Sequence, residues 1–193
     1  MGRGARRVTA LYDANVLYPA PIRDLLIRLS RAGIVGARWT ARIHDEWMRN
    51  LLKNRPDLSP ARLRRTRELM EGAVPGALVE DYEHHVPRLV LPDSDDRHVL
   101  AAAIETGADV IVTFNTRDFP ADAVRPYGIE IQTPDVFVLR LLARHPAVVH
   151  AAVRTQRASL RKPPLTVDQY LSHMAASGLP RTADALRQMS AKL

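Results

Sequence analysis

Three aspartates stand close together in the sequence LPDSDDRHVLAAA (residues 91–103), directly before an apolar run. Asp93, Asp95 and Asp96 are crowded there although the chain as a whole is basic, with 28 Lys and Arg against 21 Asp and Glu. Neighbouring carboxylates repel one another, and they cannot all stay ionised unless a cation compensates their charge. Mg²⁺ and Mn²⁺ prefer carboxylate oxygens, and such ions promote hydrolysis of phosphodiester bonds. The stretch therefore predicts metal-assisted phosphoryl chemistry.

Three further acids are expected to join Asp96. Asp13 ends the apolar segment VTALYD, and Asp118 follows the apolar run VIVTF by four residues. Glu46 lies at the edge of the apolar face of a predicted helix. In a helix, Asp96 would lie on the same face as Val99, Leu100 and Ala103, which are three, four and seven positions later. These residues are apolar, so Asp96 is expected to face the protein interior. If the strands are parallel, these acids meet at one end of the sheet, where open α/β folds bind ligands.

Each acid also has a simpler role when it is taken alone. The acids at the strand ends could be turn residues, and Glu46 could pair with an arginine four positions before it or three after it. Within LPDSDD, Asp93 or Ser94 is expected to cap a helix, and Asp95 to interact with the helix dipole. These simpler roles account less well for the whole set, because independent turn acids need not converge on one end of one sheet.

Short apolar segments alternate with amphipathic ones along the first part of the chain. Strands are predicted at residues 8–13, 34–39, 109–114 and 129–133, with a weak strand at 77–81. Helices are predicted at 21–33, 40–54, 58–70, from the aspartate cluster to Thr106, and at 134–145, with Thr40 and Ser59 as N-caps. The alternation predicts an α/β fold with a central parallel sheet flanked by helices.

The pattern changes after Pro146, where no further strand is predicted. Three helices are expected at residues 147–162, 166–177 and 182–193, separated by prolines and a glycine. We therefore predict two parts, an α/β domain at residues 1–145 and a helical C-terminal appendage at residues 146–193.

Composition narrows the classes of function. The chain has no cysteine, which excludes disulfides, thiolate metal sites and cysteine nucleophiles and fits a cytoplasmic location. No stretch approaches the roughly 18 apolar residues of a membrane span, so no membrane partner is expected. The net charge of +7 favours a polyanion such as nucleic acid, although an acidic protein would also satisfy it. No phosphate-binding glycine loop is present, which argues against nucleotide-driven motors and dinucleotide oxidoreductases.

Four segments together resemble the PIN-domain nucleases, and most closely the VapC-type toxins of bacterial toxin–antitoxin pairs. They are LYDANVL, IHDEW, DSDDRHVLAAA and VTFNTRDF, all within residues 8–135. The resemblance implies a PIN-like domain with an acidic pocket for one or two Mg²⁺ or Mn²⁺ ions. Its metal-binding and catalytic acids would be Asp13, Glu46, Asp96 and Asp118. The chain departs from the family at Asn115, where many members carry an acid, so either Asp118 substitutes or the fourth position is weakened.

The resemblance also implies an activity and a set of partners. The activity is metal-dependent endonucleolytic cleavage of RNA by a cytoplasmic toxin. Family members are usually inhibited by a small cognate antitoxin that inserts a segment across the acidic pocket, often with an arginine, and many form homodimers. The main alternative is a non-catalytic RNA-binding module that keeps the PIN fold. A phosphatase with an aspartyl nucleophile is disfavoured, because the segment DAN lacks an acid two residues after Asp13.

Several polar residues are expected to assist the acids. Thr113, Asn115 and Asn15 are supporting candidates, the first two by positioning the attacking water, and Arg97 is placed to contact the scissile phosphate. Two basic segments are expected to contact nucleic-acid phosphates, although a solvated helix face accounts for each of them equally well. These are the segment with Arg64, Arg65 and Arg67, and the segment with Arg154, Arg157, Arg161 and Lys162.

The histidines near these motifs are expected to be structural or to lie on the surface. His84 and His85 are adjacent, so their side chains should project apart, and no further ligand stands at a useful spacing. His98 follows Asp96 by two residues and should therefore point to a different side of the helix.

Overall fold

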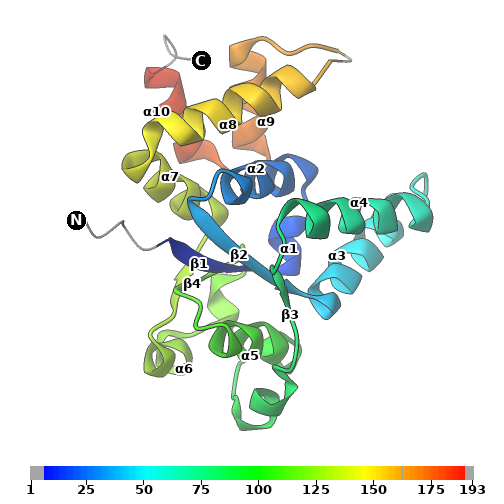
Figure 1. The fold of residues 1–193 in the computed structure, drawn as a ribbon, viewed down its shortest axis with the longest axis vertical. Helices are drawn as coiled ribbons and strands as arrows, with labels where there is room; N and C mark the ends of the chain where they lie inside the picture. Colours follow the sequence, from blue (N-terminus) through cyan, green and yellow to red (C-terminus); the bar gives the residue numbers. More distant parts are fainter. Residues whose placement is uncertain (1–6, 162, 190–193) are drawn as a thin grey trace.

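A five-stranded parallel sheet lies at the centre of the protein in a computed structural model that describes residues 7–161 and 163–189 (Figure 1). The strand order is β3-β2-β1-β4-β5. In chain order the strands are β1 (Val8–Tyr12), β2 (Val35–Thr40), β3 (Leu78–Val79), β4 (Val110–Val112) and β5 (Glu130–Gln132). All neighbouring strands are parallel, and Tyr12 lies opposite Val112 at the centre. The predicted parallel sheet is confirmed.

Helices cover both faces of the sheet (Figure 1). On one face lie α2 (Ala20–Arg31) and α7 (Pro134–Arg144), and on the other α5 (Arg97–Glu105) and α6 (Ala121–Val124). This cover explains why all three residues of β4 are buried and apolar. The connection after β1 runs to β2 on one side of the sheet, and the connection after β4 runs to β5 on the other side. The two connections therefore diverge between the adjacent strands β1 and β4. In open α/β sheets, this is the point at which ligands bind.

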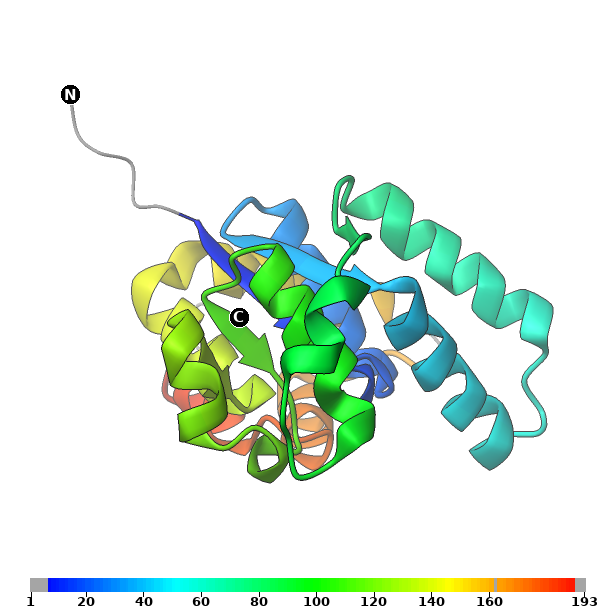
Figure 2. The same ribbon diagram turned by 90° about the horizontal axis from the view of Figure 1, so that it is seen from below.

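Two helices form a hairpin that projects from the sheet. They are α3 (Ala41–Asn54) and α4 (Pro60–Ala73), which lie side by side in Figure 2. The Thr40 hydroxyl caps α3 by accepting from the backbone N–H of Ile43 at 3.0 Å. Ser59 caps α4 in the same way, and Pro60 occupies its first position. Both predicted helix starts are confirmed.

The predicted elements differ from the structure mainly where a segment is short. A four-residue helix, α1 (Ala14–Leu17), directly follows β1 and was not predicted. Four 3₁₀ turns were missed as well: η1 (Glu83–Arg88), η2 (Ser94–Asp96), η3 (Thr116–Asp118) and η4 (Arg125–Tyr127). Such segments contain at most two helical turns, which is too short for an apolar period to become visible.

Three helices after Pro146 confirm the helical C-terminal part. They are α8 (Pro146–Ser159), α9 (Val167–Ala176) and α10 (Pro180–Gln188), and they pack above α2 and α7 in Figure 1. Buried Asp135 of α7 accepts from the backbone N–H groups of Arg181 and Thr182 at 3.0 and 2.9 Å, which ties α10 to the sheet domain. The predicted ends at 162 and 193 lie outside the described residues. No described helix is long and apolar enough to cross a membrane.

Candidate metal centre at the carboxyl end of the sheet

Asp13 lies at the junction between β1 and α1 and is almost completely buried. One of its oxygens accepts from the backbone N–H of Ala14 at 2.6 Å. The other accepts from the Asn15 amide and the Thr113 hydroxyl, each at 2.6 Å. Burial raises the pKa of Asp13, the hydrogen bonds from Thr113 and Ala14 oppose this, and the charge of Glu46 raises it further. Asp13 is therefore held rigidly at the centre of the sheet edge.

Thr113 and Asn15 join the ends of β1 and β4. The Thr113 hydroxyl donates to Asp13, and its oxygen accepts from the backbone N–H of Asn115 and from the Asn15 amide, each at 3.0 Å. The side-chain oxygen of Asn15 (Oδ1) accepts from the backbone N–H of Phe114, also at 3.0 Å. Of the supporting residues predicted from the sequence, Asn15 and Thr113 thus donate to Asp13 and fix its orientation.

The aspartates that begin the α5 segment form the second part of the cluster. One carboxylate oxygen from each of Asp93, Asp96 and Asp118 lies within 4.8 Å of the others. Burial raises the pKa of Asp96 to about 7, and the charge of Asp13, a hydrogen bond with Asp118 and the charges of Asp118 and Asp93 act in the same direction. The Asn115 amide donates to Asp118 and so holds it in place. Asn115, which stands where many family members carry an acid, therefore orients the carboxylate of Asp118.

Asp93 is an acid whose place in the cluster the sequence did not reveal. It was predicted only as a possible cap, and it does cap η2 by accepting from the backbone N–H of Asp95 at 2.8 Å. The same carboxylate also faces Asp96 and Asp118. Three residues complete one turn of a 3₁₀ helix, so residues three positions apart lie above one another, and this brings Asp93 and Asp96 to one side.

Glu46 reaches the site from α3 and already contacts Arg42 and His98. Its Oε1 lies 3.1 Å from the Arg42 guanidinium and 3.1 Å from Nε2 of His98. Burial raises the pKa of Glu46, but the hydrogen bonds and charges of His98 and Arg42 outweigh it, so the net shift is downward. Its charge and that of His98 both act on Asp13, which places the pair beside the acids. Glu46 therefore differs from Asp96, because its charge is compensated within the protein.

His98 corrects one prediction from the sequence. It was expected to point to a different side of the helix from Asp96 and to have no part in the acidic site, but it is buried and contacts Glu46. Its other ring nitrogen, Nδ1, is buried without a hydrogen-bond partner among the described residues. The Nε atom of the neighbouring Arg97 is likewise buried without a hydrogen-bond partner among the described residues. The contact of Arg97 with a scissile phosphate remains a prediction, and this buried donor is compatible with it.

The predicted arginines of α4 lie on the projecting hairpin. Arg65 pairs with Glu68 at 3.0 Å, and Arg67 with Glu71 at 2.8 Å, whereas Arg64 is exposed. The pairs reduce the net positive charge of this surface, so phosphate binding there remains a prediction. Of the second basic segment, Arg154, Arg157 and Arg161 are described, and Lys162 lies outside the described residues.

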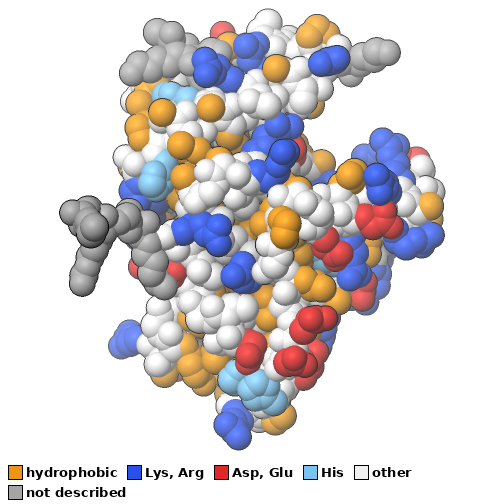
Figure 3. Space-filling view, in the orientation of Figure 1, with side chains coloured by type: hydrophobic (Ala, Val, Ile, Leu, Met, Phe, Trp, Pro, Cys, Tyr) orange, Lys and Arg blue, Asp and Glu red, His pale blue; other side chains and the backbone are white. Residues whose placement is uncertain are grey.

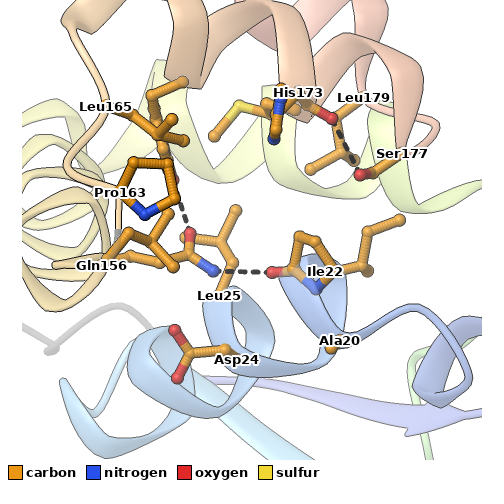
Figure 4. Close-up of a pocket in the computed structure, with 14 residues that line it drawn as sticks. Ala20, Ile22, Asp24, Leu25, Gln156, Pro163, Leu165, His173, Ser177 and Leu179 are labelled. Carbon is orange, nitrogen blue, oxygen red and sulfur yellow. Dashed lines mark hydrogen bonds between the residues drawn. The ribbon is translucent and has the colours of Figure 1, made fainter.

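A pocket of about 460 Å³ lies elsewhere, between α2 and the C-terminal helices (Figure 4). Its lining is mostly apolar, with Ile22, Leu25 and Leu165 among the residues that face it. The Gln156 side chain donates to the carbonyl of Pro21 at 2.7 Å and accepts from a tyrosine hydroxyl, so its polar atoms are occupied. The pocket lacks the converging oxygens of the acidic cluster and does not present the same chemistry.

Comparison with known proteins identifies the family. The family model for the PIN domain matches residues 9–117, more than half of the chain. This chain belongs to the PIN-domain family. The model for the VapC50 C-terminal domain matches residues 134–188 of the same chain. The two matches confirm the resemblance to VapC-type PIN-domain proteins that the sequence motifs indicated.

A relative of this PIN-domain protein is "Putative ribonuclease VapC50" of Mycobacterium tuberculosis. The two are 36% identical over 94 residues, which is 49% of this chain and 55% of the relative. The match thus spans about half the length of the curated relative. No solved structure matches the chain. The VapC50 C-terminal match begins at Pro134, the first residue of α7, whereas the boundary at residues 145–146 stays a prediction.

The acids of this PIN domain fit a hard divalent cation. The carboxylates of Asp93, Asp96 and Asp118 supply only oxygen donors, as Mg²⁺ and Mn²⁺ prefer. The pKa of Asp96 is raised to about 7, first by burial and then by the charges of the neighbouring aspartates, which repel a further negative charge at this place. A divalent cation would remove this repulsion. Asp13 lies beside them and acts on the pKa of Asp96 in the same direction.

Proposed function

We propose that this protein is a Mg²⁺- or Mn²⁺-dependent endoribonuclease and the toxin of a toxin–antitoxin pair. The observation that carries the proposal is the set of converging carboxylates at the β1–β4 divergence, in a chain with a PIN domain. The name of the VapC50 relative describes a ribonuclease, which supports RNA as the substrate class. The net charge of +7 also favours a polyanionic substrate.

Asp93, Asp96 and Asp118, whose carboxylate oxygens converge, would hold the cation, and Asp13, which acts on Asp96 from beside them, would join them. The bound ion would neutralise charge on a phosphodiester oxygen and lower the pKa of a coordinated water. Thr113 keeps the Asp13 carboxylate oriented, and burial excludes water from that side of the site.

Glu46 and Arg97 are also assigned to the site, but their contacts differ from those of the aspartates. Glu46 is held by His98 and Arg42, so it orients these groups at the edge of the site in the form described by the structure. To bind an ion directly, Glu46 would have to give up its contact with Arg42 or with His98. Arg97 is our candidate for contacting the phosphate, because it directly follows Asp96 in the chain.

The decisive experiment measures cleavage of RNA by the purified full chain with and without Mn²⁺. We expect cleavage that chelator abolishes. Asp13→Asn and Asp96→Asn should each reduce the rate by about 100-fold or more, since the metal supplies several kcal/mol of transition-state stabilisation. Asp122→Asn, which alters an exposed acid on α6, is the matched control and should cleave normally. Full activity of Asp96→Asn, or full activity in chelator, would contradict the assignment.

A non-catalytic RNA-binding module is the second candidate, and the ion pairs of Glu46 favour it. The acids of a metal-dependent centre must be free to bind the ion, and one acid here is already compensated by protein cations. This alternative predicts that RNA binds equally well in chelator and in Mn²⁺, without turnover. A gel-shift and a cleavage assay on the same RNA sample distinguish the two functions.

The proposal includes a small cognate antitoxin as the protein partner. The support is the VapC-type resemblance together with an acidic cluster that would attract an inserted arginine. A small open reading frame immediately upstream of the gene is the expected genomic arrangement. Co-expression of its product should abolish RNA cleavage, and a product that neither binds the protein nor inhibits cleavage would contradict the toxin assignment.

A further inference from the structure

A second cluster of possible metal ligands lies apart from the acidic centre. His84 and His85 belong to η1, and Glu105 is the last residue of α5. The Oε2 atom of Glu105 lies 3.0 Å from Nε2 of His85 and 3.7 Å from Nε2 of His84. One ligand atom from each residue lies within 4.8 Å of the others. In Figure 3, histidine and acidic side chains adjoin at the lower end of the molecule.

This arrangement corrects the prediction that the adjacent histidines project apart and lack a ligand partner. Their ring centroids are 4.0 Å apart, so the two imidazoles lie side by side. Glu105, twenty positions after His85, approaches both rings from a different element. The cluster is therefore built by the packing of η1 against α5.

The spacing of the ligand atoms suits a small ion. In a tetrahedral zinc site, Zn–N and Zn–O bonds of about 2.0–2.1 Å place neighbouring ligand atoms about 3.4 Å apart. The separations of 3.0 and 3.7 Å lie on either side of this value. The shorter one is a hydrogen bond from Nε2 of His85 to the carboxylate, so a bound ion would displace that proton. Two imidazole nitrogens and one carboxylate oxygen form a donor set found in zinc proteins, with one position left for water.

His84 is also oriented in the way that metal-binding histidines usually are. Its Nδ1 lies 2.7 Å from the backbone carbonyl of Asp81, which can only accept a hydrogen bond. Nδ1 therefore carries a proton, and in the neutral ring the lone pair is on Nε2, the atom that faces Glu105. A backbone carbonyl bonded to the second ring nitrogen fixes both the tautomer and the ring orientation.

We infer that His84, His85 and Glu105 form a binding site for Zn²⁺ or a similar borderline divalent ion. Imidazole nitrogen favours such ions, whereas the oxygen-only acidic cluster favours Mg²⁺ or Mn²⁺, so the two sites select different metals. The ion would link η1 to the end of α5, the helix whose first turns carry Asp96 and His98. The site serves to fix α5 against η1 and is separate from the proposed nuclease chemistry.

The experiment measures Zn²⁺ binding to the metal-stripped full chain in millimolar Mg²⁺, which occupies the acidic centre. Calorimetry should detect one Zn²⁺ ion per chain. The variant with both His84→Ala and His85→Ala, and the single variant Glu105→Gln, should weaken this binding by at least about 100-fold, the upper range for loss of a second-shell partner. Zn²⁺ should raise the melting temperature of the wild type and leave that of the double variant unchanged.

Two control variants distinguish this site from Zn²⁺ binding elsewhere on the chain. His173→Ala removes an exposed histidine of α9, and Asp96→Asn alters the acidic cluster, so both should bind Zn²⁺ as the wild type does. Should the double variant fail to fold, the wild-type titration decides, because Zn²⁺ must shift the imidazole Cε1–H resonances of His84 and His85. Zn²⁺ binding that survives in the double variant, or a titration that leaves both resonances unmoved, would overturn the inference.

Discussion

Replacing Asp96 with Asn should stabilise the protein in the absence of metal, and the gain should depend on pH. The raised pKa of Asp96, about 7 against an ordinary 3.8, corresponds to roughly 4 kcal/mol of disfavoured ionisation at high pH. Because Asp96 is only partly buried, solvent screening reduces this figure, and we expect about 1–2 kcal/mol. Asn keeps the size of the side chain and can donate a hydrogen bond to Asp118 at every pH.

The direction of the pH effect follows from proton binding. Between about pH 4 and pH 7 the folded wild type retains a proton on Asp96 that the unfolded chain has lost, so its stability falls as the pH rises. The variant lacks this contribution. The difference in free energy of unfolding, variant minus wild type, should therefore be near zero at pH 4 and reach about 1–2 kcal/mol at pH 8.

Urea denaturation in chelator, measured across this pH range, tests the prediction. In a thermal unfolding experiment at pH 8, the melting temperature of the variant should be roughly 2–8 °C higher than that of the wild type. Adding Mg²⁺ should then stabilise the wild type more than the variant, because an ion that binds only the folded state raises its stability. Asp122→Asn serves as control and should show no such trend. A difference that is constant with pH, or a variant less stable than the wild type at pH 8, would refute the electrostatic reasoning.

Two further predictions concern the C-terminal helices. Asp135→Ala should lower the free energy of unfolding by about 2–4 kcal/mol in urea denaturation, because it removes the carboxylate that accepts from the backbone N–H groups of Arg181 and Thr182. An effect below about 1 kcal/mol would show that water replaces the carboxylate. Gly178→Ala should cost about 1–3 kcal/mol, because φ is +109° and a Cβ would lie 2.7 Å from the Phe114 ring. Gly72→Ala in α4 meets no neighbouring atom within 4 Å and should instead gain about 0.5–1 kcal/mol, so equal effects of the two substitutions would contradict this steric argument.

The sequence could predict those parts of the fold that depend on local signals. Thr40 and Ser59 mark the starts of α3 and α4, since each residue caps the helix with its own hydroxyl. The apolar run at residues 109–114 predicted a strand, and β4 (Val110–Val112) lies within it. The 3₁₀ turn η2 could not be predicted, because three residues carry too little pattern to distinguish it from the first turn of α5.

The candidate site was predictable to the extent that the strand ends determine it. Asp13 and Thr113 follow adjacent parallel strands, and the structure joins them by a hydrogen bond of 2.6 Å. His98 was misplaced because its position depends on the packing of α3 against α5, which brings Glu46 within 3.1 Å. No sequence spacing encodes that contact. The pairing of His85 with Glu105 was missed for the same reason.

The outermost strands limit how this protein can assemble. At one border of the sheet β3 has two residues, and at the other β5 has three. Borders of this length offer few unpaired backbone groups, so they make a poor template for a strand from another molecule. An antitoxin or a second copy of the chain should consequently attach through helical surfaces and loops. The same brevity protects a protein with an all-parallel sheet against edge-to-edge aggregation while it folds.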